Sequence, residues 1–370
     1  REMNLRIFQK TPYPGVLFQP RMEPWVEWHR QFGLLPSRWR DKSLLDIYDE
    51  LDLSMRYVHY HTGMPDPVRM EYPGEVKFRV AEQGEKRAIS VETPYGNLYE
   101  EQKYTVDKTW RTVGFYGKSR EDLRRIGWLI SRVKYSFSLE NFMKGAEFIG
   151  DRGVPQFWVP KSPYQALAQS WFKFEDFIMV LAEYPEETEE VMRAIDSSYD
   201  GLYEEVCACP GVRIVNFGEN IHSALFSPRY IDRYYMPFYE KRVGQLHRAG
   251  KYAHMHWDGY VKPVQRYLKL MPFDGIEALT SLPQGDITLE EIKENLGGKI
   301  LLDGIPAALF LDHHSREELE ECTRKVIELF HPNLVLGISD ELPEGSGGEA
   351  IERLKWVSDY CKRAKGAGKG

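Results

Sequence analysis

The chain has 370 residues, enough for one large domain or two ordinary ones, with 28% charged residues and a net charge of −7. An acidic balance with both signs mixed argues against a nucleic-acid-binding protein, which would gather basic residues on one face. No apolar run approaches the roughly 18 residues of a membrane span, and the first ten residues lack the apolar core of a signal peptide. The four cysteines are few and irregularly spaced, so we expect a cytoplasmic protein without a disulfide framework. Together with the charge and the apolar runs, this predicts a protein that binds neither nucleic acid nor a membrane.

Short apolar segments recur along the chain, and most are followed by a turn and an amphipathic helix. They are rich in β-branched or aromatic residues and bounded by Gly, Pro or Asp, as is typical of strands. They cover residues 15–20, 56–61, 154–160, 213–219, 252–257, 274–279, 299–305 and 334–340. Eight such strands alternating with helices predict an α/β fold, a (β/α)8 TIM barrel that forms one domain over residues 1–370. The alternative is an open doubly wound sheet, which no glycine-rich nucleotide motif supports.

Residues 75–118 break this pattern near the N-terminus. Polar and apolar residues alternate there between turn signals, of which "TPYGNL" is one. This predicts an antiparallel β-meander inserted between barrel elements. We expect the insertion either to cover the barrel mouth or to support a homodimer.

Serines mark the start of two helices in the remaining sequence. Ser119 precedes an acidic first turn, and Ser315 is followed three residues later by Glu318, the pattern of a capping box. The final residues 362–370, "KRAKGAGKG", predict an unstructured tail.

The stretch "KYAHMHWDGY", residues 251–260, holds the strongest candidate for chemistry. His254 and His256 are two residues apart on one expected strand, so both rings face the barrel interior. Glu277 lies on the next strand, and Asp340 ends the last one. Two imidazole nitrogens with carboxylates suit Zn²⁺, so these four residues predict a zinc site. The alternative is a pair of core histidines bonded to a barrel carboxylate.

Other polar and aromatic residues fall where barrel strands end, which is where barrel active sites lie. Glu219 is a candidate catalytic base, a further ligand or a residue that orients a histidine. Asp258 is either catalytic or the N-cap of the next helix. We expect Asn220 to bind substrate, and the pocket walls to come from the aromatic residues Tyr60, Trp158, Phe217 and Trp257.

Three stretches resemble the uroporphyrinogen decarboxylase-like superfamily, in particular its corrinoid-dependent methyltransferases. They are "GENIHSALFSPRYIDRYYMPFYEKRVGQLHRAGKYAHMHWDG", "GIEALTSLPQGDITLEEIKENLGGKILLDGI" and "LVLGISDELPEG". The stretches "RYVHYHTGMPDPV" and "VETPYGNLYEE" look like the methyltransferase components of aryl methyl ether O-demethylases.

The resemblance implies a ligand set in which both cysteines of the related zinc enzymes are missing. Those enzymes use His-x-Cys and a late cysteine, and the similar cobalamin-independent methionine synthases add a glutamate. His254 matches the histidine, His256 the first cysteine and Glu277 the glutamate, while Ser339 or Asp340 falls at the late cysteine. Harder ligands favour activation of an ether oxygen over activation of a thiol.

The resemblance therefore implies a zinc-dependent methyltransferase. It would move a methyl group from an O-methyl donor, such as an aryl methyl ether, to the Co(I) corrinoid (cobalamin) of a partner protein. The chain has no D-x-H-x-x-G cobalamin motif of its own.

Three alternatives remain open at this point. One is a metal-free uroporphyrinogen decarboxylase-like lyase with Asp258 or Glu219 as acid or base, although only Arg21 stands where decarboxylases carry an arginine-rich motif. The second is a methyltransferase that passes a methyl group from a corrinoid to another acceptor. The third is a non-enzymatic barrel that binds a corrinoid or a tetrapyrrole.

Overall fold

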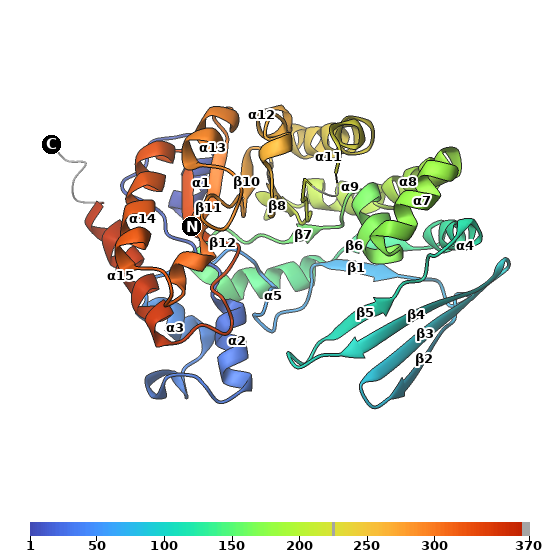
Figure 1. Cartoon of the computed structure of the whole chain (residues 1–370), viewed down its shortest axis with the longest axis horizontal. Coiled ribbons are helices and arrows are strands. Elements are labelled where there is room, and N and C mark those ends of the chain that lie inside the picture. Colours follow the sequence, from blue (N-terminus) through green and yellow to red (C-terminus); the bar gives the residue numbers. More distant parts are fainter. Residues whose placement is uncertain (224–225, 365–370) are drawn as a thin grey trace. The chain divides into compact units, whose positions relative to one another are not determined.

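The computed structural model describes residues 1–223 and 226–364 and divides into two compact units (Figure 1). Unit 1 comprises Arg1–Pro67, Ser138–Val159 and Cys209–Gly370, and unit 2 comprises Val68–Phe137 and Pro160–Ala208. This differs from one domain with an insertion at 75–118. The difference arises because the helices of residues 120–130 and 160–208 fold with the antiparallel strands rather than with the parallel ones.

Unit 1 is built on a parallel sheet that has six strands in the described part of the chain, in the spatial order β12-β11-β10-β9-β8-β7. Their bounds are Trp158–Val159 (β7), Ile214–Phe217 (β8), Tyr252–His256 (β9), Gly275–Glu277 (β10), Ile300–Pro306 (β11) and Leu334–Ser339 (β12). Every residue of β8, β10, β11 and β12 is buried. Such fully apolar or buried strands are typical of parallel sheets that are covered on both faces.

The two remaining expected strands, at residues 15–20 and 56–61, are not regular strands. Isolated parallel bridges join Phe18 to Leu336 at one edge of the sheet and Tyr57 to Gln156 at the other. A closed eight-stranded barrel is therefore not detected among the described residues, and the observed fold is a mixed α/β fold with a six-stranded parallel sheet. Pro14 and Pro20 flank the first segment, and proline has no N–H to extend a ladder.

Helices of unit 1 cover the sheet, and Figure 1 shows α11 to α14 along one side of it. The bounds are α1 Glu2–Phe8, α2 Glu23–Gln31, η1 Ser37–Trp39, α3 Leu44–Glu50, α5 Leu139–Ile149, η2 Gly150–Arg152, α10 Pro228–Tyr230, η4 Ile231–Tyr235, α11 Met236–Arg248, η5 Lys262–Val264, α12 Tyr267–Leu270, α13 Leu289–Asn295, η6 Ala307–Phe310, α14 Arg316–Phe330 and α15 Gly348–Ala364.

Side-chain caps fix several of these helix starts. The capping box of Ser315 and Glu318 is confirmed at the start of α14, and Ser119 caps α4 of unit 2. Of the expected tail, residues 362–364 belong to α15, and residues 365–370 lie outside the described residues.

A cluster of apolar side chains closes the amino ends of the parallel strands. Ile7 and Phe8 of α1 pack against residues at or near the starts of β8, β11 and β12, among them Ile214, Ile300 and Val335. Each such buried side chain contributes roughly 1.5–3 kcal/mol. The amino ends of the strands are therefore closed by apolar side chains, which leaves the carboxyl ends for polar residues.

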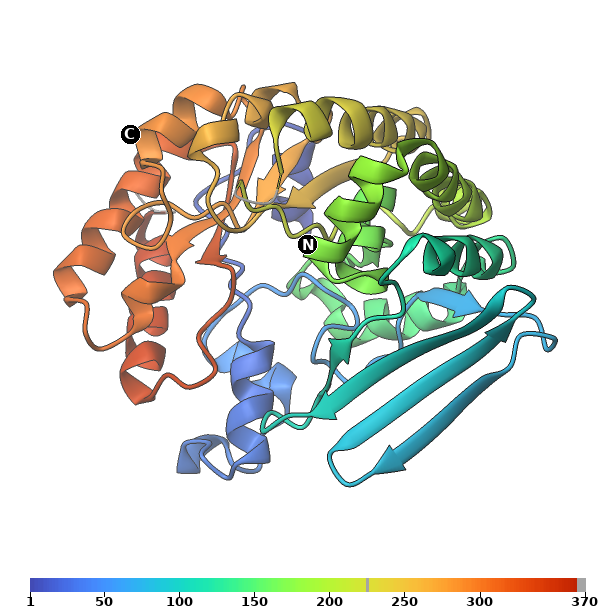
Figure 2. The same ribbon diagram turned by 45° about the vertical axis from the view of Figure 1, so that its right-hand side comes forward.

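Unit 2 contains a four-stranded antiparallel sheet in the order β2-β3-β4-β5 and a two-stranded pair β1-β6 within the described residues (Figure 2). The bounds are Val68–Glu71 (β1), Phe78–Gln83 (β2), Lys86–Thr93 (β3), Gly96–Tyr104 (β4), Trp110–Gly114 (β5) and Lys134–Phe137 (β6). Val91 of β3 pairs with Leu98 of β4, and both are fully buried. The turn between these strands needs Gly96, whose φ of 109° disfavours other residues.

The helices of unit 2 pack on this sheet and on one another. They are α4 Arg120–Ile130, α6 Pro163–Ala166, the π-helical turn η3 Leu167–Trp171, α7 Phe174–Glu183, α8 Pro185–Ser198 and α9 Asp200–Ala208. Leu123 and Ile126 on α4 are buried, and Arg120 forms an ion pair with Glu187 of α8. Unit 2 therefore has a core of its own.

None of the helices in the described part of the chain is both long enough and apolar enough to cross a membrane.

Candidate active site

A buried ionic network lies among the strands of unit 1. Nη1 of Arg56 is 2.7 Å from Oε1 of Glu277 on β10, and Nη2 is 2.8 Å from Oδ1 of Asp303 on β11. All three side chains have no exposed surface. Burial alone would raise the pKa of Glu277, but the charges of Arg56 and Arg21 outweigh it and hold that pKa well below its usual value. Glu277 is therefore an anion at neutral pH.

Tyr57 and Asn216 complete the shell of Glu277. The hydroxyl of Tyr57 lies 2.6 and 2.7 Å from the two carboxylate oxygens, and Nδ2 of Asn216 donates to Oε2. Burial, followed by the charge of Glu277, raises the pKa of Tyr57 well above its usual value, so the phenol keeps its proton. Glu277 thus accepts hydrogen bonds from both neutral and charged donors, a strong arrangement for a buried carboxylate.

Arg21 links this network to the more open part of the site. It lies 3.8 Å from Glu277, forms an ion pair with Asp340, and its Nε donates to the backbone oxygen of Asp340 at 2.8 Å. Its guanidinium also lies 5.9 and 5.8 Å from the ring centres of Tyr57 and Tyr60. A permanent cation therefore borders two aromatic rings.

The two histidines stand on β9 as the sequence predicts, both directed toward Glu277. Register places His254 beside Asn216 and Gly275, and His256 beside Glu277. Nε2 of His254 lies 2.7 Å from Oε1 of Gln156. Burial lowers the pKa of His254 to about 3, so the ring is neutral at pH 7. When Nε2 donates to Gln156, Nδ1 keeps a lone pair, and it has no hydrogen-bond partner among the described residues.

The four predicted zinc ligands do not form one metal site as they stand. Nδ1 of His254 and Nδ1 of His256 lie 3.4 and 3.8 Å from Oε2 of Glu277. Asp340 approaches the other nitrogen of His256, Nε2, at 3.9 Å. Glu277 and Asp340 therefore face opposite nitrogens of the His256 ring. A single ion bound to one of these nitrogens could not be coordinated by both carboxylates.

Charge also opposes a metal ion at this place. Arg56 and Arg21 already neutralise Glu277, and Arg21 pairs with Asp340. In the described part of the chain, no group of three or more His, Cys, Asp or Glu side chains could hold a metal ion. The arrangement therefore does not fit a preformed zinc centre.

Other predicted site residues have clear places near the strand ends. Glu219 follows β8 and is fully buried, while Asn220 beside it is exposed. Asp258 is half-buried after β9, and the next short helix η5 begins after Val261 without a side-chain cap. Asp286 accepts from the backbone nitrogens of Val261 and Lys262 instead. Asp258 is therefore not the N-cap of that helix, and its catalytic role stays a prediction.

Two of the four predicted wall residues lie together beside Arg21. The ring of Tyr60 lies 4.9 Å from that of Trp158, edge-on, and Trp158 stacks on Tyr57 at 4.1 Å. Both Tyr60 and Trp158 are partly exposed, so they can contact a substrate.

Phe217 and Trp257 do not line this space. Phe217 packs against Phe238, Tyr239 and Phe273, and both predicted residues are fully buried. Alternation along a strand explains the difference, because Asn216 and His256 face the network and the next residue in each case points the other way.

The residues that sequence reasoning missed come mainly from the first two irregular segments. Arg56 and Tyr57, which the sequence analysis did not name, carry much of the charge and hydrogen bonding around Glu277. Arg21 was named only as a match to the decarboxylase motif, not as a partner of Glu277. Asn216 could have been found, since it has the same strand parity as His254 one strand away. Neither arginine belongs to an alternating strand pattern or a helical pattern that would have directed it toward the site.

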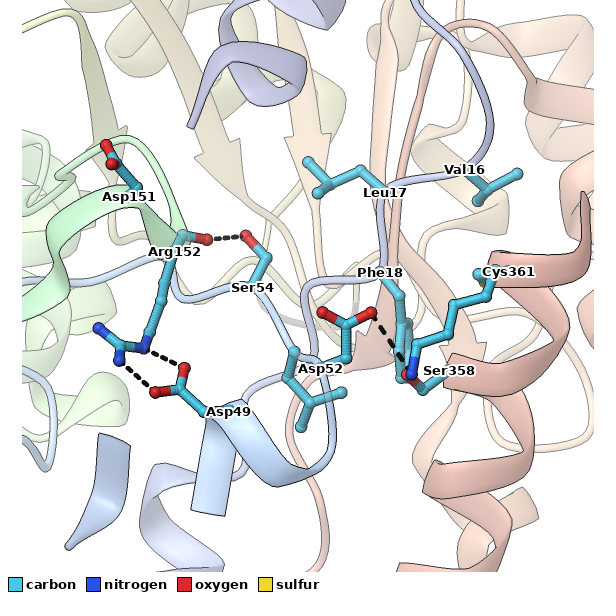
Figure 3. A pocket seen from close by; sticks show the side chains of 12 residues that line it. Val16, Leu17, Phe18, Asp49, Asp52, Ser54, Asp151, Arg152, Ser358 and Cys361 are labelled. Carbon is cyan, nitrogen blue, oxygen red and sulfur yellow. Dashed lines mark hydrogen bonds and ion pairs between the residues drawn. The ribbon is translucent and has the colours of Figure 1, made fainter. Parts of the chain in front are cut away.

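A separate cavity of about 450 Å³ lies in unit 1 and is lined by side chains from residues 16–18, 49–54, 151–152 and 358–362 (Figure 3). Its lining includes Phe18, Asp52 and Ser358, and an ion pair joins Arg152 to Asp49 at its edge. It contains none of the residues of the network around Glu277. Two of its carboxylates are paired, Asp49 with Arg152 and Asp52 with Lys362, and we assign it no role in the chemistry.

Comparison with known proteins gives a likeness of fold. No protein-family model matches the sequence, and no curated protein matches it. A methyltransferase from Methanosarcina mazei has a similar structure, with a TM-score of 0.58 and 11% identity over 97% of each chain.

Two further solved structures are more distantly similar. A B12-independent methionine synthase from Shewanella, in complex with selenomethionine, has a TM-score of 0.45 and 13% identity over 95% of this chain and 96% of that one. A putative vitamin-B12-independent methionine synthase from Listeria monocytogenes has a TM-score of 0.42 and 13% identity over 97% and 98%. At these identities the likeness concerns fold alone.

Proposed function

We propose that this chain is a methyltransferase that takes a methyl group from an O-methyl donor, an aryl methyl ether, and passes it to the Co(I) corrinoid of a partner protein. The observation that carries the proposal is that Asp340 contacts both Arg21 and His256, and that the ring of Tyr60 lies beside Arg21 and against Trp158. The methyltransferase of similar fold supports the reaction class, and the sequence resemblance supports the donor and the acceptor.

The proposed transfer needs a charge-stabilising group at the leaving oxygen. When the methyl carbon leaves, the C–O bond breaks and its electron pair stays on the oxygen as a phenolate. Arg21 supplies a fixed positive charge, and His256 can donate a proton to that oxygen. The corrinoid would supply the nucleophile that receives the methyl group.

The remaining residues of the chain position these two groups. Asp340 pairs with Arg21 and approaches Nε2 of His256, so it can orient both. The buried pair of Glu277 and Arg56 lies next to both groups, since Glu277 is 3.8 Å from Arg21 and 3.8 Å from His256. Tyr60 and Trp158 offer ring faces and edges to an aromatic donor, and a ring stacked there excludes water.

The test is a panel of methoxylated phenols incubated with the chain and a reduced corrinoid protein, followed through the cobalt absorption spectrum. We expect methyl transfer by the wild type and a loss of about 100-fold or more in kcat for His256→Gln. His247→Gln is the matched control, because His247 is exposed on α11 and pairs with Asp274 away from the network. Spectra that do not change with any donor, or equal loss in both variants, would refute the proposal.

Zinc at His254, His256, Glu277 and Asp340 is a separate prediction that rests on the family resemblance, and the transfer described above does not depend on it. Transfer in the opposite direction, from the corrinoid to another acceptor, would use the same residues. In the same assay it would appear as demethylation of a methylated corrinoid.

A metal-free lyase is the second candidate, favoured by one observation. Arg21 is a buried guanidinium beside His256 and Asp340, which suits a substrate carboxylate and an acid–base pair. Release of carbon dioxide without any corrinoid would favour this reaction over methyl transfer.

A further inference from the structure

A second cavity, of about 560 Å³, lies wholly within unit 2. Its volume is in the range of small-molecule sites. Six aromatic side chains line it, from β2, β6, the π-helical turn η3 and the residues just after β1, β5 and α8: Tyr72, Phe78, Tyr116, Tyr135, Trp171 and Tyr199. None of these residues takes part in the network around Glu277.

The rings form three contacting pairs. Tyr72 and Phe78 have centroids 5.0 Å apart, Tyr135 and Tyr199 4.9 Å, and Tyr116 and Trp171 5.7 Å. Rings in such pairs hold one another in place, so their faces and edges form a stable lining.

Local backbone structure fixes the third pair. Trp171 ends the π-helical turn η3, and its backbone oxygen accepts from the nitrogen of Gly117 at 2.8 Å. A side chain at Gly117 would approach Phe172 within 2.4 Å, so only glycine allows this contact. Single π-helical turns inside helices are frequent at functional sites.

Glu100 of β4 places a carboxylate in this aromatic lining. Its Oε1 accepts from Nε2 of Gln102 at 2.7 Å and from Oγ1 of Thr112 at 2.8 Å, and the hydroxyl of Tyr116 also bonds to it. These donors are all neutral, and across residues 1–223 and 226–364 Glu100 forms no ion pair. The carboxylate is thus held in place while its charge is not neutralised by a side-chain cation.

We propose that this cavity binds an organic cation, an alkylated ammonium group joined to an apolar body. Aromatic faces attract such a cation through their quadrupoles, and a carboxylate beside them adds a direct charge interaction. The cavity is much larger than an ammonium head group requires, so the apolar body would fill the rest between Met70, Ile130 and Ile195. Lys161 also lines the cavity, and its like charge should weaken binding of a simple cation.

The probe for this proposal is benzyltrimethylammonium, compared with its neutral carbon isostere, neopentylbenzene, by calorimetric titration of the full chain. We expect the cation to bind about tenfold more tightly than the isostere. Glu100→Gln should remove most of that preference, because it keeps the shape and loses the charge. Lys161→Met should strengthen binding of the cation.

Glu101→Gln is the matched control. Glu101 is the next residue of β4, so it has the same charge, but it is exposed and directed to the other face of the sheet. Thermal unfolding of each variant confirms that it is folded. Equal affinity for the cation and the isostere, or equal effects of Glu100→Gln and Glu101→Gln, would overturn the proposal and indicate a neutral apolar ligand. Absence of binding by both probes would also overturn it.

Discussion

Arg56→Met tests whether the ionic network holds unit 1 together. The substitution removes a guanidinium with no exposed surface that lies 2.7 Å from Glu277 and 2.8 Å from Asp303. At an effective dielectric of about 20, each contact is worth about 6 kcal/mol of Coulomb energy. Desolvation of the three charges offsets much of this, and removal of one partner of a buried pair usually costs about 3–5 kcal/mol. We expect that loss in the free energy of unfolding at pH 7.

The measurement is urea unfolding followed by circular dichroism, with Arg38→Met as the control. Arg38 also lies near two carboxylates, Glu50 and Glu352, but half of its side chain is exposed. Its replacement should therefore cost about 0–1 kcal/mol. Equal losses for the two variants would show that the buried network contributes no more than a surface pair, and would refute the reasoning.

The pH dependence gives a second check on the same variant. Stability that arises from a lowered carboxyl pKa is present above the unfolded value, about 4.3 for Glu, and is lost as the pH falls through the folded value. The pKa of Glu277 is lowered by Arg56 and Arg21. The difference between wild type and Arg56→Met should therefore be largest above pH of about 5 and smaller in more acidic solution.

Three further predictions concern the site. Metal analysis of the purified chain separates two expectations: the family resemblance predicts about one zinc per chain that His256→Ala removes, whereas the observed arrangement predicts equal, negligible zinc in both proteins. In zinc-free protein, the His254 ring should stay neutral in NMR titrations well below pH 6, because burial lowers its pKa to about 3. Between that value and about 6.5 the unfolded chain binds a proton that the folded chain does not. The free energy of unfolding should therefore decrease as the pH is lowered through this window, and decrease less in His254→Gln. Gly218→Ala should raise KM for the methyl donor with little change in kcat, because its Cβ would lie 2.9 Å from the ring of Trp158; an unchanged KM would contradict the placement of that ring in the donor site.

The sequence patterns predicted the six strands of the parallel sheet, but not how the two segments beside its outer strands would pair. Six of the eight expected strand segments contain strands of the parallel sheet. The segments at 15–20 and 56–61 pair only at Phe18 and Tyr57. Apolar composition marks a segment as buried, but prolines and the distant partner residues decide whether a full ladder forms.

Parity along the strands explains most of what could and could not be predicted in the site. The spacing of His254 and His256 correctly directed both rings toward Glu277. Phe217 and Trp257 have the opposite parity and pack in the core. Arg21 and Arg56 reach the site from segments that meet it only through contacts distant in sequence, which no local pattern contains.

The two units alternate along the sequence, and this sets the order in which each can be completed during synthesis. Unit 2 is complete once Ala208 has emerged, whereas the sheet of unit 1 lacks five of its strands at that moment. Phe18, made near the beginning, cannot reach its partner Leu336 until the last strand appears. Arg21 and Arg56 must likewise wait for their acidic partners Glu277 and Asp303, and chaperones would have most to protect there.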